Sequence, residues 1–142
     1  MQSSHKSKLS KKLTKSEINQ ICKLKNSQWK YGLNSQIKWF KKNINDDDIH
    51  NFIIHKKIII SYTCLKKRTL YLKNNLTKKY YLYFDTCIVK KNFRNLGIGN
   101  KIMLLNSNVI KKNKLPSFLL CEKKLVEFYN QFGWKKISKT NI

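Results

Sequence analysis

The residues best suited to chemistry lie in one short loop that contains Arg94, Gly97 and Gly99. The two glycines carry no Cβ, so they let the main chain come close to a ligand and adopt angles that a side chain would forbid. An apolar run, Tyr80 to Val89, precedes the loop, and an amphipathic helical pattern follows it. Because the first N–H groups of a helix lack internal partners and lie at the positive end of its dipole, such a loop can bind a phosphate group.

A glycine pair before a helix also occurs in plain turns, so spacing alone leaves both interpretations open. Composition favours a functional loop. The 142 residues include 29 Lys and 16 Asn but no Ala, only two Arg and four Gly, and one of those arginines and two of those glycines fall within residues 94–99. We infer that the loop is selected for what it binds.

The pattern Arg94-x-x-Gly97-x-Gly99 after a strand resembles the acetyl-CoA-binding motif of the GNAT superfamily of N-acetyltransferases. Residues 125–134 resemble that family's second motif, a helix carrying Tyr-x-x-x-Gly-aromatic, here Tyr129 followed by Gly133 and Trp134. The two motifs stand in the right order, with a short strand predicted between them. They cover about residues 80–135, and the N-terminal half matches the family by element order alone.

The resemblance implies that the chain binds acetyl-CoA as a co-substrate and needs no metal. The backbone of one loop would hold the pyrophosphate, through Arg94, Asn95, Leu96, Gly97, Ile98, Gly99 and Asn100. The backbone of Cys87, Ile88 and Val89 would pair with the pantetheine arm like an added strand. An N–H near Ile88 would then face the thioester oxygen.

Tyr129 matches the tyrosine that many family members place beside the coenzyme sulfur, and we expect it to act as the general acid. A phenol with a pKa of about 10 is protonated at neutral pH. Tyr129 also fits as one more packing residue on an apolar helix face, together with Leu125, Phe128 and Phe132.

Asp85 and Glu122 are the candidates for the general base. A carboxylate inside an apolar strand is costly unless it is paired or used. Asp85 is expected on the strand face of Val89, as a base, as a ligand for the acceptor's ammonium, or as a turn residue; Tyr83 matches the family's glutamate position more closely. Glu122 stands where the family often has an asparagine, and it could act through water or favour a helix start.

The pattern of elements predicts an α/β (α+β) fold: a mixed, mostly antiparallel sheet with helices on both faces and a parallel strand pair at the coenzyme cleft. Residues 1–12 are expected to be a basic flexible tail and residues 13–142 a single domain. Thr14 and Glu17 predict a capping box. The remaining ranges are a second helix over 33–44, strands over 49–54, 57–65, 69–72, 80–89, 117–121 and 134–138, helices after 98 and 125, and a turn at 74–75.

Two clusters outside these motifs have both a structural and a functional interpretation. The acidic run Asp46 to Asp48 suits a loop or an amine contact. Trp29, Tyr31 and Trp39 suit helix packing or the lining of an acceptor pocket. Four dispersed cysteines and three histidines match no metal-binding spacing, and reduced thiols are expected.

The formal charge of +24 is carried by lysines spread over every segment, which argues against a dedicated nucleic-acid surface. No apolar run reaches membrane-spanning length and no signal peptide is evident, so a cytoplasmic protein without a membrane partner is expected. A homodimer is compatible with a sheet edge left open after the last strand. We predict an enzyme that transfers acetyl from acetyl-CoA to a primary amine of a small molecule or a protein by direct attack in a ternary complex. The alternatives are a basic nucleic-acid-binding module and a coenzyme-A-binding domain without catalysis.

Overall fold

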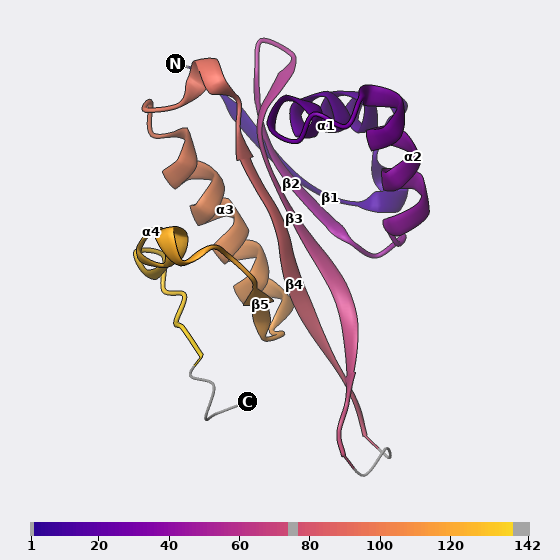
Figure 1. Ribbon diagram of the computed structural model, residues 1–142, viewed down its shortest axis with the longest axis vertical. Coiled ribbons are helices and arrows are strands. Elements are labelled where there is room, and N and C mark those ends of the chain that lie inside the picture. The colour runs from indigo at the N-terminus through magenta and orange to yellow at the C-terminus, as the bar shows by residue number, and fades with distance from the viewer. Residues whose placement is uncertain (1, 74–76, 138–142) are drawn as a thin grey trace.

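The computed structural model describes residues 2–73 and 77–137, which build one five-stranded sheet with the order β1-β2-β3-β4-β5 (Figure 1). The first four strands pair antiparallel, and β5 pairs parallel to β4. This confirms the predicted mixed sheet with one parallel pair. The strands are β1 Ser4–Leu9, β2 Ile49–His55, β3 Ile58–Tyr71, β4 Lys78–Val89 and β5 Ser117–Leu119.

Helices cover both faces of the sheet, as predicted (Figure 1). α1 and α2 pack on one face over a core that includes Phe52 and Tyr62, and α3 and α4 pack on the other over Leu65 and Phe84. The helices are α1 Lys15–Gln28, α2 Leu33–Asn43, α3 Ile98–Asn113 and α4 Val126–Asn130, and the short 3-10 turns are η1 Ser10–Lys12, η2 Lys91–Phe93 and η3 Lys123–Leu125. No helix in the described ranges is both long and apolar enough to cross a bilayer.

The predicted capping box fixes the start of α1. The Thr14 hydroxyl accepts from the Glu17 N–H at 3.1 Å, and the Glu17 carboxylate accepts from the Thr14 N–H at 2.9 Å. These bonds satisfy donors that the first helical turn leaves free. The turn between α1 and α2 passes through Gly32, whose φ of 95° is a left-handed conformation that disfavours other residues.

Residues 4–9 form the edge strand β1, so the prediction of a flexible tail over residues 1–12 was wrong there. The strand pairs with Ile49–Ile54 of β2. Ser7 Oγ donates to Asn51 Oδ1 at 2.6 Å, and the Lys8 ammonium pairs with Glu17 at 2.9 Å. Main-chain pairing and polar contacts hold this strand. Its residues do not alternate between apolar and polar, which is the pattern by which strands are found in a sequence.

Three predicted strand boundaries also differ from the structure. Predicted strands over 57–65 and 69–72 are one strand, β3, because the lysine-rich residues between them pair with β4. The strand predicted over 117–121 ends at Leu119, and residues 134–137 form no strand. The turn predicted at 74–75 and the end of the last predicted strand, Ser138, lie outside the described residues.

Candidate active site

A β-bulge at Asp85 reverses the two faces of β4 halfway along the strand. Phe84 pairs with Leu65 and Thr86 pairs with Cys64, so Asp85 is an extra residue with no partner in β3. Before the bulge, Phe84 packs in the α3 core, whereas Ile88 packs in the α1–α2 core. Regular alternation would place both side chains on one face of the strand, and the extra residue inverts that alternation.

The bulge also marks the point where β4 loses its neighbour β5. The parallel pairing covers only Leu82 to Phe84 of β4. The Leu82 N–H donates towards β5, to Pro116 O at 2.9 Å, and the Lys90 N–H donates towards β3, to Ile60 O at 2.8 Å. Since N–H groups alternate in direction along a strand, those of Cys87 and Val89 point to the edge that β5 leaves open.

The main chain of Ile88, predicted to bind the coenzyme, faces β3 and not the open edge. Its carbonyl accepts from Ser61 Oγ at 2.9 Å, and its side chain is buried in the α1–α2 core. Its main chain is thus engaged with β3. The available N–H groups belong to its neighbours Cys87 and Val89.

The loop between β4 and α3 is an open turn at a helix N-terminus. Asn95 and Gly97 have φ of 64° and 80°, both left-handed. A Cβ placed on Gly97 or Gly99 would meet no atom within 4 Å, so the space in front of the turn is free. Within the described ranges, the N–H groups of residues 95–100 donate to no protein acceptor. This is the geometry in which main-chain N–H groups bind phosphate oxygens.

Arg94 holds the loop to both the sheet and α1. Its Nε donates to Val89 O at 3.0 Å, and its Nη2 donates to Gln28 Oε1 at 3.0 Å. Through these bonds, the one arginine of the loop connects the end of β4 with the end of α1. In this structure its guanidinium orders the turn.

Tyr129 in α4 lies beside the open edge of β4. Its ring meets Phe84 edge-on at a centroid distance of 5.9 Å, and it lines a cavity of about 610 Å³ together with Cys121 and Trp134. Burial raises the pKa of Tyr129 to about 12, and the neighbouring thiols of Cys87 and Cys121 act in the same direction. The phenol is therefore protonated throughout the neutral range. Its neighbour on the open edge of β4 is Cys87.

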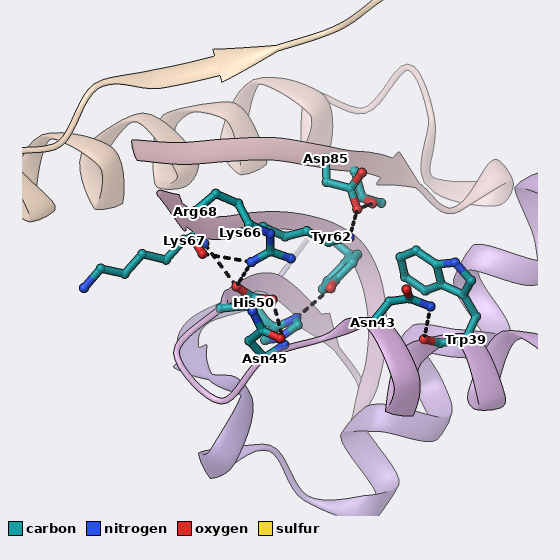
Figure 2. Close-up of polar contacts among 11 residues, drawn as sticks. Trp39, Asn43, Asn45, His50, Tyr62, Lys66, Lys67, Arg68 and Asp85 are labelled. Atoms are coloured by element: carbon teal, nitrogen blue, oxygen red, sulfur yellow. Dashed lines mark hydrogen bonds and ion pairs between the residues drawn. The ribbon is translucent and has the colours of Figure 1, made fainter. Parts of the chain in front are cut away.

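Asp85 points to the opposite side of the sheet, towards α1 and α2. It pairs with Lys66 Nζ at 3.0 Å, and that ammonium lies 4.5 Å from the ring centre of Trp39 (Figure 2). Val89 packs against the α3 core, so the predicted shared face was wrong, again because of the bulge. Asp85 and Tyr129 thus line different cavities.

The cavity on the Asp85 side has a volume of about 540 Å³. It opens between α1, α2 and the bulge of β4, so the aromatic cluster at the α1–α2 junction lies beside a cavity. Its lining consists of Lys25, Trp29, Tyr31, Ser35, Gln36, Trp39, Asp85 and Thr86.

Two other acidic candidates line neither of these cavities. The Glu122 side chain is 73% exposed and pairs with Lys124 at 3.3 Å on the surface. Asp48 is fully buried, and it accepts from the N–H groups of Asn45 and Lys67 and from Arg68 at 2.9 to 3.0 Å. It anchors a turn, so the proposed amine contact of the acidic run does not involve Asp48.

Lys25 and Lys66 are site residues that the sequence interpretation missed. Lys25 follows Ile21 by one helical turn and therefore lies on the apolar stripe of α1, and it is 8% exposed. Its ammonium lies 4.2 Å from the ring centre of Trp39, and burial lowers its pKa. A lysine on a buried stripe is the signal that could have found it.

No protein-family model and no curated protein sequence matches this chain. Solved structures do. The chain superposes on an Arabidopsis thaliana glucosamine-6-phosphate N-acetyltransferase with a TM-score of 0.67 and 16% identity, over 95% of this chain and 94% of that one. For a predicted acetyltransferase from Clostridium acetobutylicum with acetyl-CoA, the TM-score is 0.71 and the sequence identity is 13%, over 97% of this chain and 93% of that one.

An aminoglycoside N-acetyltransferase in complex with CoA gives a TM-score of 0.73 at 9% identity, over 98% of this chain and 93% of that one. The chain therefore has the GNAT fold, an architecture that these acetyltransferases share. Within residues 2–73 and 77–137, no three His, Cys, Asp or Glu side chains gather in a metal-binding arrangement.

Proposed function

We propose that this protein is an N-acetyltransferase that moves the acetyl group of acetyl-CoA to a primary amine in a ternary complex. The observation that carries the proposal is the open turn at residues 94–100, with its free N–H groups beside the unpaired edge of β4. Structures of the same fold are described as holding CoA and acetyl-CoA. Those names support an acyltransferase activity. The acceptor has to be inferred from this chain's own residues.

The coenzyme would be held by main chain rather than by side chains. The N–H groups of residues 95–100 would bind the pyrophosphate, each contributing roughly 1.5–3 kcal/mol as a bond to a charged acceptor. Cys87 and Val89 would pair with the pantetheine arm along the open edge. Their N–H groups are also the donors available to stabilise negative charge that develops on the thioester oxygen.

The chemistry requires the acceptor nitrogen to bond to the acetyl carbon while the carbon–sulfur bond breaks. The ammonium loses two protons, one of which ends on the coenzyme thiol and the other in water. We assign Tyr129 to protonate the departing sulfur, because its phenol stays protonated and lies near Cys87. We assign Asp85 to receive the ammonium and pass its proton to water. Glu122 has no part, because its carboxylate is exposed and paired.

Replacing Gly99 with valine tests the coenzyme site directly. A side chain there meets no protein atom, so the fold should be kept, but it would occupy the space in front of the turn. We expect CoA affinity, measured by calorimetry, to fall at least about tenfold. Ser16→Val is the matched control. Ser16 is the exposed second residue of α1, as Gly99 is the second residue of α3, and it lies outside the loop of residues 94–100. Unchanged CoA affinity in Gly99→Val, or no CoA binding by the wild type, would overturn the proposal.

A further inference from the structure

The charges around the cavity between α1 and α2 are unbalanced. Among the described residues, one carboxylate lines it, that of Asp85, and two lysine ammonium groups lie at the same Trp39 ring, within 4.2 and 4.5 Å of its centre. Lys66 and Asp85 neutralise each other through their 3.0 Å ion pair. One positive charge, on Lys25, remains.

The ammonium of Lys25 makes no hydrogen bond and no ion pair with any described residue, although the residue is only 8% exposed. It lies over the face of the Trp39 ring. Removing an ammonium from water without an anionic partner is unfavourable. Since Lys25 lines the cavity, a negative group of a bound molecule could supply that partner.

The number of cationic groups indicates which anion fits. A carboxylate can pair with the one ammonium that the described lining residues provide, that of Lys25. A phosphate monoester carries three acceptor oxygens and nearly two negative charges at neutral pH, which one ammonium satisfies only in part. A polycationic amine would meet a net positive surface and be repelled.

Aromatic side chains form the rest of the wall. The indoles of Trp29 and Trp39 are 39% and 40% exposed, and Tyr31 is 73% exposed at the rim. Exposed aromatic faces of this size favour contact with an apolar group of a ligand. The cavity therefore combines one cation, one carboxylate and an apolar wall.

We propose that the acceptor is a small amino carboxylate with an apolar side chain, whose carboxylate binds Lys25 and whose ammonium meets Asp85. This inference rests on the proposed acetyltransferase function and names its substrate class. It assigns Lys25 as a specificity-determining residue. It excludes polycationic amines as good substrates.

The test compares acceptors that differ in one group. Coenzyme thiol release from acetyl-CoA is measured with L-phenylalanine, phenethylamine (which lacks the carboxylate), glucosamine 6-phosphate and spermine. We expect kcat/KM for L-phenylalanine to exceed that for phenethylamine at least tenfold. In Lys25→Met this ratio should fall towards one, while Lys23→Met, on the exposed side of the same helix, should keep it.

Binding of L-phenylalanine to the protein saturated with CoA is measured by calorimetry, so that the inference is tested even without turnover. No L-phenylalanine binding to the CoA complex, or a better reaction with phenethylamine, the phosphate or spermine, would overturn the acceptor class and leave the acetyltransferase standing. Failure to bind CoA at all would instead overturn the proposed function. Retention of the preference in Lys25→Met would remove Lys25 from its role.

Discussion

The guanidinium of Arg94 donates a hydrogen bond to the side-chain oxygen of Gln28, with a distance of 3.0 Å between Nη2 and Oε1. This bond joins the loop proposed for the coenzyme to the last residue of α1. The next residue, Trp29, lines the proposed acceptor cavity. The two proposed binding regions, on opposite sides of β4, are therefore connected through one exposed polar contact.

Gln28→Ala should weaken CoA binding modestly, by about two- to fivefold, because an exposed hydrogen bond contributes roughly 0.5–1 kcal/mol. Arg94→Ala should have a larger effect, since it removes the bond to Val89 O as well. Calorimetric titration with CoA measures both. Gln28→Glu keeps an acceptor for Arg94 and is the control; a loss of affinity as large as in Gln28→Ala would show that this bond does not order the loop.

Tyr129→Phe should lower kcat about a hundredfold or more, the usual contribution of a general acid, with little change in the KM for acetyl-CoA. The hydroxyl bonds to no described residue, so the melting temperature should stay within about 2 °C. Because the pKa of Tyr129 is about 12, the wild-type rate should show no decline from this group below about pH 10. Tyr80→Phe, at an exposed position of β4, is the control. A fully active Tyr129→Phe enzyme would leave Tyr129 as a packing residue.

His50 should make folding stability depend on pH. Its ring nitrogens lie 2.7 Å from Ser10 Oγ and 2.6 Å from the Tyr62 hydroxyl. Figure 2 shows the contact with Tyr62. Burial lowers the pKa of His50 to about 4, with Lys25 and Lys66 acting in the same direction. The unfolded chain binds a proton on this residue near pH 6.5, whereas the folded chain binds it near pH 4. Stability is therefore complete above about pH 6.5 and is lost as the pH falls towards 4, by roughly 3 kcal/mol.

Urea unfolding between pH 7.5 and 4.5 measures this dependence. His50→Gln removes the titrating group and should flatten the curve across that window, even though its absolute stability is lower. An equally steep curve in His50→Gln would assign the dependence to other residues.

The two lysines at Trp39 should respond in opposite ways to replacement by methionine. Lys25→Met removes a buried charge without a partner and should raise the melting temperature by about 3 °C. Lys66→Met leaves the carboxylate of Asp85 unpaired and should lower it by several degrees. Calorimetric scans of both variants in the absence of ligand provide the test. A decrease in Lys25→Met comparable to that in Lys66→Met would mean that Lys25 has a stabilising partner in the free protein.

The parts of the fold that the sequence predicted correctly are those determined locally. The capping box at Thr14, the turn at Gly97 and the apolar stripe of α3 each depend on residues within a few positions of one another. The parallel pairing of β4 and β5 followed from the helix that connects them. These elements place the loop of residues 94–100 between β4 and α3.

The parts that the sequence did not predict depend on distant partners. The bulge at Asp85 is defined by the register of β3 against β4, which no local pattern records. It changed the face of Asp85 and turned the main chain of Ile88 away from the open edge of β4. Lys25 was overlooked because charged residues are expected at the surface, and only the packing of α1 against α2 shows that it is buried.

The extra residue in β4 makes the length of this strand as important as its composition. Deleting Asp85 alone would restore regular pleating and exchange the two sides for every residue from Thr86 to Val89. Ile88 would then turn towards α3, and Cys87 towards α1. Homologues with this architecture should accordingly tolerate many substitutions in β4 but neither insertions nor deletions between Phe84 and Val89, a pattern that an alignment would reveal as a run of fixed length.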